Sequence, residues 1–147
     1  MNNTENLKII RANMDKRSEK YKDICLRVPY GLKGFAKDVY DNVKGTWGDY
    51  ECIVKGVFDD DRVYVYIEDL NISKDIFIDD FMPYLRSKNE MTDAERRIHE
   101  SLYHYDNGNF VLLDSWMETE FFLEHHFDIH DMIGEGLAKK ASQGMYE

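Results

Sequence analysis

The run Val63-Tyr-Val-Tyr-Ile67 restricts the fold of this chain more than any other segment. Its β-branched and aromatic residues favour a strand, and such a strand needs a partner. The apolar segment at residues 50–58 lies one polar turn away, which predicts a hairpin over residues 50–69. The same residues at 50–58 also fit a helical template, so both interpretations stay open there. In the hairpin, alternate side chains face opposite sides of the sheet, with Val63, Val65 and Ile67 on one side and Tyr64, Tyr66 and Glu68 on the other.

Three elements are predicted before the hairpin. Residues 2–20 place Leu7, Ile10 and Met14 at helical spacing, which predicts an amphipathic helix. Residues 22–28 alternate apolar and polar side chains, so we expect a half-buried strand that ends at Pro29. Residues 31–43 carry their apolar side chains on one helical face and are followed by Gly45, which predicts a second helix.

Mainly helices are predicted after the hairpin. Ser73 can cap a helix that Pro83 would kink or restart, because proline lacks the amide donor. Thr92-Asp-Ala-Glu95 is a capping box, and the helix that it begins should run to Asn107-Gly108. Residues 110–113 form a short apolar strand, and a second capping box at Ser115-Trp-Met-Glu118 begins a helix to about Gly134.

The chain is long enough to bury a core, and no repeat, linker or low-complexity segment divides it. We therefore predict a single α+β domain over residues 1–147. It should contain about four strands, mostly antiparallel, packed with four or five helices.

The net charge of −10 is unevenly distributed along the chain. Residues 1–44 carry ten basic and six acidic side chains, whereas residues 45–147 carry nine and twenty-three. A basic N-terminal segment thus precedes an acidic body. Such an asymmetry bears on partners rather than on the fold, and most of this protein would repel a nucleic acid. With only two cysteines and no long apolar run, we expect a soluble cytoplasmic protein that does not span a membrane.

The acidic side chains near the predicted hairpin are interleaved with tyrosines, and together they form our candidate partner-binding set. Carboxylates of this kind can occupy a cationic groove, while aromatic rings add contact area at small entropic cost. The set comprises Asp59, Asp60, Asp61, Tyr64, Tyr66, Glu68, Asp69, Asp79 and Asp80.

A histidine-rich segment at residues 124–131 is the main candidate for metal binding. On a helix, His126 and His130 would share one face, as the two histidines of a zinc-binding helix do. A third ligand such as His99 or His104 is not specified, and the alternative is a solvated polar face. The glycine clusters match no phosphate loop, and neither Cys25 nor any carboxylate pair forms a catalytic signature. We therefore predict a non-enzymatic protein with no cofactor and no metal.

In its small size, acidity and aromatic content, the chain resembles phage-encoded inhibitors of bacterial defence, the anti-CRISPR and anti-restriction proteins. This resemblance implies a phage or mobile-element inhibitor acting in the host cytoplasm. It would block a basic, nucleic-acid-binding defence protein, such as a CRISPR effector, by partly mimicking nucleic acid. Direct DNA binding is not expected, and either one chain or a homodimer would form the working unit.

Residues 21–57 also resemble the strand-helix-helix order of ribbon-helix-helix DNA-binding proteins. The resemblance rests on the run from Tyr21 to Lys33, the predicted helix to Lys44, Gly45 and the run Cys52-Ile-Val-Lys-Gly-Val57. It implies a dimeric transcriptional regulator in which Asp23, Cys25 and Arg27 enter the major groove. Asp23 has the wrong sign for such a contact, and a hairpin at residues 50–69 would remove the second helix.

Overall fold

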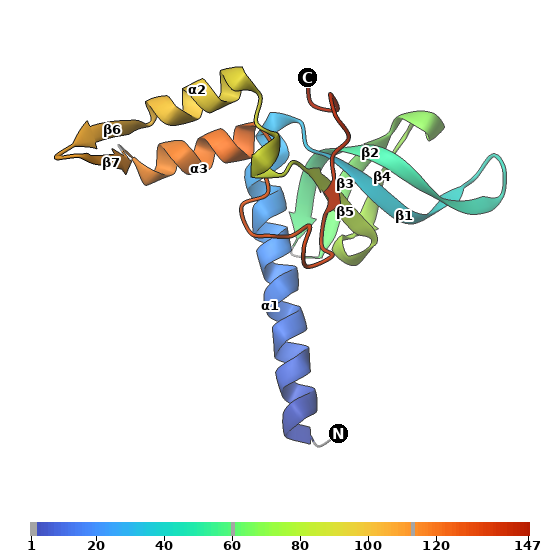
Figure 1. Ribbon diagram of the computed structural model, residues 1–147. Helices are drawn as coiled ribbons and strands as arrows, with labels where there is room; N and C mark the ends of the chain where they lie inside the picture. The colour runs from blue at the N-terminus through green and yellow to red at the C-terminus, as the bar shows by residue number, and fades with distance from the viewer. Residues whose placement is uncertain (1–2, 60, 113) are drawn as a thin grey trace.

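The computed structural model describes residues 3–59, 61–112 and 114–147, but not the side chains of residues 12–14. Among these residues the chain forms three α-helices and eight strands (Figure 1). The helices are α1 (Asn3–Arg27), α2 (Asp93–Ser101) and α3 (Ser115–Glu124). The strands are β1 (Lys33–Asp41), β2 (Thr46–Asp59), β3 (Arg62–Ile67), β4 (Ile72–Phe77), β5 (Phe81–Leu85), β6 (Tyr103–Asp106), β7 (Asn109–Leu112) and β8 (Lys139–Lys140).

Six strands form one mixed sheet in the order β4-β3-β2-β1-β5-β8, and β6 pairs with β7 in a separate hairpin. All pairs are antiparallel except β5 with β8. The α+β class is confirmed, but the prediction of about four strands with four or five helices is wrong. The hairpin at residues 50–69 is confirmed, because β2 pairs antiparallel with β3.

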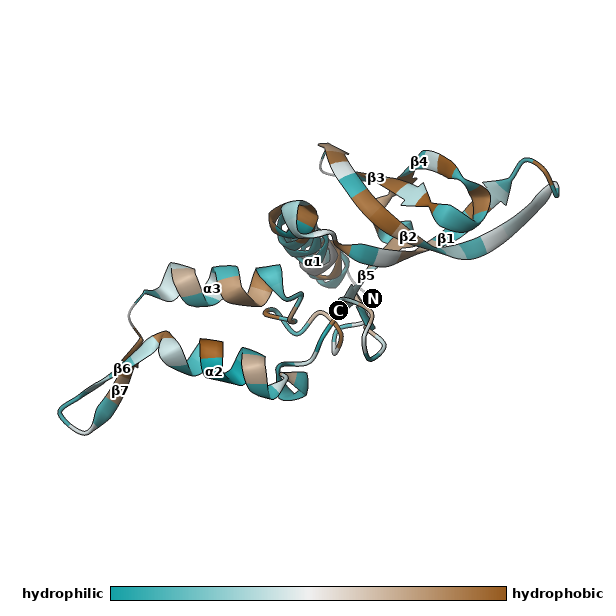
Figure 2. Cartoon of the chain, turned by 90° about the horizontal axis from the view of Figure 1, so that it is seen from above, coloured by the Kyte–Doolittle hydropathy of each residue, from teal (hydrophilic) through white to brown (hydrophobic). Residues whose placement is uncertain are grey.

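The core lies on the inner face of the six-stranded sheet, and α1 closes it. Val63, Val65 and Ile67 of β3 are fully buried, as the alternation predicted, while Tyr64 and Tyr66 lie on the half-buried outer face. Figure 2 shows the sheet on one side of α1 and the pair α2 and α3 on the other.

Helix α1 is longer than predicted and includes residues 22–27, and Val28 begins a 3₁₀ turn, whereas we expected a strand over residues 22–28. The buried side chains of this segment follow helical rather than alternating spacing, with Lys20, Asp23, Ile24 and Arg27 all buried. Asp23 and Arg27 form an ion pair at 2.6 Å inside the protein. Hydropathy alone could not show this stripe, because three of its four members are charged.

Residues 31–43 form strand β1 instead of the predicted helix. The register of β1 against β2 shifts between Ala36 and Val39, and Asp38 has a positive φ of 54°. This β-bulge inserts an extra residue, so the buried positions on its two sides, Ala36 and Val39, lie three apart. A three-residue step in the burial pattern imitates the period of a helix.

Residues 73–85 also form strands where a helix was predicted. A 3₁₀ turn at Ile78–Asp80 joins β4 to β5 and interrupts the alternation of side chains between the two faces of the sheet. Phe77, Phe81 and Leu85 therefore fall four residues apart without a helix. Pro83 is accommodated in β5, where it pairs with Gly34.

The segment α2-β6-β7-α3, which we call the arm, projects from the sheet (Figure 1). The capping box at Thr92 and Glu95 is confirmed. The helix ends at Ser101, however, and Asn107-Gly108 forms a hairpin turn with positive φ at both residues. The predicted strand at residues 110–113 is the β7 strand, although Leu113 lies outside the described residues.

Helix α3 ends at Glu124, ten residues before the predicted end. Its first turn is capped by Asp114, which accepts from the Trp116 N–H, rather than by Ser115. His126 then adopts a positive φ of 60°, and the chain turns back to pair beside Arg86. Long-range main-chain contacts thus end this helix.

The order of elements from residue 21 to 57 is helix, strand, strand. The strand-helix-helix order of the ribbon-helix-helix resemblance is therefore absent, and Asp23 and Arg27 are buried instead of outward. Among the described residues, no helix is both long and apolar enough to cross a membrane.

Candidate functional site

The predicted partner-binding residues separate into two groups at opposite ends of β3. Asp59 and Asp61 lie at the turn that precedes β3, and Asp79 and Asp80 lie beside them, since the Ile78 N–H donates to the Asp61 carbonyl at 2.8 Å. We call these four residues the turn group. Asp60 lies outside the described residues.

The carboxylates of the turn group are partly engaged within the protein. The Asp61 N–H donates to Asp59 at 3.2 Å, and hydrogen bonding with Asp61 holds the pKa of Asp59 below its ordinary value. Asp79 forms an ion pair with Arg17 of α1. Part of the negative charge that the sequence placed here is therefore balanced by the basic helix.

The second group, Tyr66, Glu68 and Asp69, lies at the other end of β3 and lines a hollow of about 400 Å³. Glu51 of β2 and Tyr84 of β5 complete its acidic and aromatic lining. We call these five residues the acidic hollow. Its remaining wall includes Lys33 and the chain near the C-terminus at residues 142–145. Tyr64 does not line it and instead contacts Phe58, with ring centroids 5.5 Å apart.

The acidic hollow carries negative charge, and two of its carboxylates have no partner among the described residues. Burial and the neighbouring Glu51 carboxylate raise the pKa of Tyr84, so its hydroxyl stays protonated. Lys33 adds one positive charge to the wall of the hollow, and its ammonium group donates to the Met145 carbonyl at 2.7 Å. Within the described part of the chain, the side chains of Glu68 and Asp69 have no ion pair or hydrogen bond. Free carboxylates beside tyrosine rings are suited to a cationic side chain.

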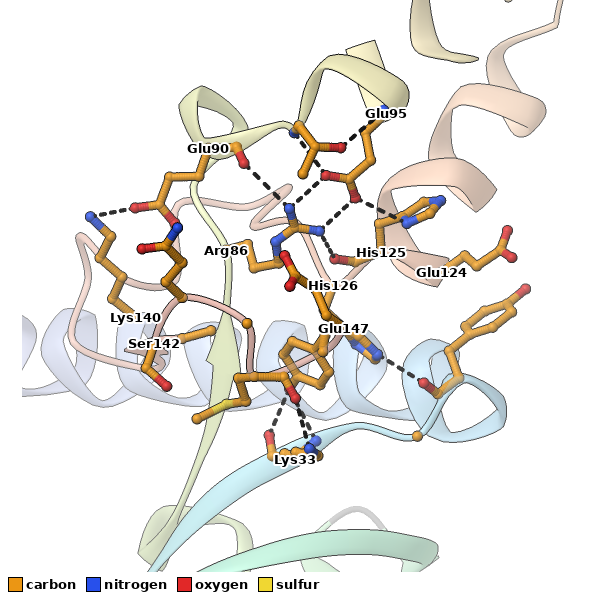
Figure 3. A pocket seen from close by; sticks show the side chains of 18 residues that line it. Lys33, Arg86, Glu90, Glu95, Glu124, His125, His126, Lys140, Ser142 and Glu147 are labelled. Carbon is orange, nitrogen blue, oxygen red and sulfur yellow. Dashed lines mark hydrogen bonds and ion pairs between the residues drawn. The ribbon is translucent and has the colours of Figure 1, made fainter. Parts of the chain in front are cut away.

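A larger cavity of about 920 Å³ lies between the arm, the sheet and the C-terminal residues (Figure 3). Its charged side chains pair mostly with one another. Arg86 donates twice to Glu95 at 2.7 Å, His125 lies 3.1 Å from the same carboxylate, and Lys140 pairs with Glu90 at 2.7 Å. The guanidinium of Arg86 holds the pKa of Glu95 at about 2. These contacts fix the arm to the sheet.

His126 is buried at the base of this cavity rather than exposed on a helix. Its Nε2 lies 2.8 Å from the Tyr30 carbonyl, so this nitrogen carries the proton, and its ring stacks on Tyr146 at 3.9 Å. Nδ1 is buried without a hydrogen-bond partner in the structure. Burial lowers the pKa of His126 to about 4, so the imidazole is neutral near pH 7.

The proposed pairing of His126 and His130 on one helix face is wrong, since α3 ends before both residues. His130 instead lies 3.4 Å from Glu19 of α1. No group of three or more histidine, cysteine or acidic residues is arranged for a metal ion in the residues that the structure describes. Cys25 lies on α1, and burial raises the pKa of Cys52 to about 12, so the Cys52 thiol is protonated.

The predicted partner-binding set includes Tyr66, Glu68 and Asp69 of this hollow but not Glu51 or Tyr84, and its role in binding stays a prediction. The two missed residues belong to other strands and reach the hollow through the sheet order alone. No local signal distinguishes Glu51 from the many other acidic residues of the chain. No family model, curated protein or solved structure matches this chain.

Proposed function

We propose that this chain is a non-enzymatic binding protein that inhibits a basic, nucleic-acid-binding protein. The acidic hollow would receive lysine or arginine side chains that otherwise contact phosphates. The observation that carries this proposal is the pair of free carboxylates, Glu68 and Asp69, held beside Tyr66 in a hollow of about 400 Å³.

The chemistry of the hollow supports this kind of partner. Carboxylates form charge-assisted hydrogen bonds with guanidinium and ammonium groups, and a tyrosine ring attracts a cation over its face. Opposite potentials also accelerate the encounter of two proteins at low salt. The acidic excess of residues 45–147 acts in the same direction and repels nucleic acid.

The finer proposal is an inhibitor of the phage anti-defence type, with a CRISPR effector or a restriction enzyme as its target. It is supported by the acidic, aromatic character of the chain. It is also supported by the chemistry that carboxylates share with phosphates, since both accept paired hydrogen bonds from an arginine guanidinium group. A partner side chain held in the hollow would be withdrawn from nucleic acid.

The experiment compares three double variants with the same change in net charge. The first variant replaces two carboxylates of the hollow with lysines, Glu68→Lys and Asp69→Lys. The second does the same in the turn group, with Asp59→Lys and Asp61→Lys. The third is the control on the arm, with Glu100→Lys and Asp106→Lys. Each protein is immobilised and exposed to nuclease-treated bacterial lysate. Bound proteins are then released with a short DNA duplex and identified by mass spectrometry.

We expect the wild type and the arm control to retain a basic nucleic-acid-binding protein that the duplex displaces. The hollow variant should bind that purified protein at least about tenfold more weakly, which corresponds to about 1.4 kcal/mol. Equal binding by the hollow variant and the control would contradict the assignment of the hollow. Retention of the duplex by this protein alone would contradict the proposed inhibition.

A further inference from the structure

A small cavity lies where α1, the bulge of β1 and the chain that precedes β8 meet. Its volume is about 180 Å³, and Gly136 and Leu137 form part of its wall. Figure 1 shows this part of the chain running beside α1 on its way to β8. The charged side chains of the lining are Lys16, Arg17 and Lys20 of α1, Lys37 of β1, and Asp79. We call this space the basic cavity.

The basic side chains reach the cavity from two separate elements. Lys16 and Lys20 are four residues apart on α1, so they share one face of the helix. Lys37 precedes Asp38, the residue with positive φ in the bulge of β1, and a bulge commonly redirects the side chains beside it. Four basic side chains thus converge on one small space in a chain whose net charge is −10.

The protein itself offsets this positive charge only in part. Among the described residues that line the cavity, Asp79 is the only carboxylate, and it forms an ion pair with Arg17. In the described part of the chain, the ammonium groups of Lys16, Lys20 and Lys37 form no ion pair. Crowded groups of like charge repel one another, so an anion between them would be bound favourably.

Lys20 is the strongest indication of a ligand, because its charge is buried without a counter-ion. The residue is only 4% exposed, and its ammonium group donates to the Ile78 carbonyl at 2.7 Å. An ammonium group has three donors, so two remain. Burial lowers the pKa of Lys20 to about 8 despite the nearby Asp79, and the group is still protonated near pH 7. Lysines buried this deeply are normally paired with an opposite charge.

We propose that the basic cavity binds a small phosphate anion, either inorganic phosphate or a phosphate monoester. Lys20 would donate from the buried side, and the exposed Lys16 and Lys37 from the solvent side. A phosphate monoester carries a charge of about −1.5 to −2 at pH 7 and three acceptor oxygens, which suits three ammonium groups. Hydrogen bonds between ammonium groups and phosphate are charge-assisted and therefore strong.

The size of the cavity restricts the ligand to a small one. Its volume of about 180 Å³ is below the roughly 300–1,000 Å³ of pockets for drug-sized molecules. A nucleic acid would in addition be repelled by the acidic body of the protein. The basic cavity and the acidic hollow share no lining residue, so this proposal goes beyond the proposed function and does not depend on it.

Phosphate binding is tested with the full chain by titration calorimetry at pH 7, with sodium chloride of equal ionic strength as the reference. We expect one phosphate per chain, half-saturated below about 1 mM. Phosphate should also raise the melting temperature, because it binds only the folded state. The absence of saturable binding at ten times that concentration would overturn the proposal.

Substitutions of two cavity lysines assign the binding to this site. Lys20→Met should weaken phosphate binding at least about tenfold, because it removes a buried charged donor. Lys37→Gln removes an exposed charge and should weaken binding about threefold. Lys8→Gln is the matched control, since Lys8 is exposed on the same helix but does not line the cavity. Urea unfolding checks that each variant folds, and the exposed Lys37 keeps the test valid if Lys20→Met does not.

A substitution of the acidic residue should have the opposite effect. Asp79→Asn removes the one carboxylate of the lining and should tighten phosphate binding about threefold. Asp75→Asn is its control, because Asp75 is an exposed residue of β4 outside the cavity. Equal affinities of the cavity variants and their controls would overturn the assignment of the site.

Two further ligands test the chemical class of the anion. Glycerol phosphate keeps the doubly charged group and should bind within about tenfold of inorganic phosphate. A short DNA single strand without terminal phosphates should bind at least about tenfold more weakly, because the acidic body repels it. Tighter binding of the DNA strand than of phosphate would overturn the assignment to a small anion.

Discussion

Gly34 and Gly56 lie on neighbouring strands of the sheet but in opposite environments. A Cβ atom on Gly34 would lie 2.1 Å from Cε2 of Phe81, which is fully buried, whereas a Cβ on Gly56 would meet nothing within 4 Å. Gly34→Ala should therefore lower the free energy of unfolding by about 1–3 kcal/mol through overpacking. Gly56→Ala should change it by less than about 1 kcal/mol. Urea unfolding of both variants measures the difference, and equal effects would contradict the close contact of Gly34 with Phe81.

The buried His126 makes stability depend on pH. Its pKa is lowered to about 4 in the folded protein and is about 6.5 in the unfolded chain, so the unfolded state binds the proton more tightly. The stabilising contribution is complete above pH 6.5 and is lost as the pH falls from 6.5 to 4. It amounts to at most about 3 kcal/mol.

This dependence can be separated from that of other groups with a neutral substitute. His126→Gln keeps a donor for the Tyr30 carbonyl but does not titrate, so its stability should fall less between pH 7 and pH 5 than that of the wild type. The exposed His104→Gln variant serves as the control and should follow the wild type. Parallel curves for His126→Gln and wild type would refute this role of His126.

Among the elements, the arm depends on one side chain at its base. Glu95 completes the capping box of α2 and also accepts two hydrogen bonds from the guanidinium group of Arg86, the residue that follows β5. Glu95→Ala should lower the free energy of unfolding by about 2–4 kcal/mol, because it removes the cap and leaves Arg86 without its partner. Glu95→Gln keeps the cap acceptor and should have a smaller effect.

Asp93→Ala provides the matched control on the same helix. Asp93 pairs with Arg96 at 3.8 Å on the exposed surface of the helix, and such pairs contribute little. Its unfolding midpoint in urea should equal that of the wild type. If Glu95→Ala had an equally small effect, the arm would not depend on this contact.

The elements that the sequence predicted correctly are those determined by local chemistry. The capping box at Thr92 and the hairpin at residues 50–69 depend on neighbouring residues alone. The helix predicted at residues 31–43 was wrong because a bulge at Asp38 introduced a three-residue step. The bulge is stabilised by pairing with β2, where the Asp49 side chain accepts a hydrogen bond from the Asp38 N–H. No local sequence pattern predicts this bulge.

At the scale of the whole molecule, the two charge segments of the sequence do not remain separate bodies. Three of the basic residues of α1 are engaged near the sheet: Arg17 by Asp79, Lys20 by the Ile78 carbonyl at 2.7 Å, and Arg27 by Asp23. Burial lowers the pKa of Lys20 to about 8. These contacts join the C-terminal half of the basic helix α1 to the rest of the protein.

The sequence by itself determined the α+β class, the β2-β3 hairpin with its two faces and the cap of α2. These features follow from side-chain alternation and capping, which act over a few residues. Only the tertiary structure decided that residues 22–28 are helical, that residues 31–43 and 73–85 form strands, and that Glu51 and Tyr84 join Tyr66 in one hollow. In each case the physical reason is a contact between distant segments: the hydrogen bond of the buried Arg27 to the Phe127 carbonyl, a bulge held by a neighbouring strand, or the order of strands in the sheet.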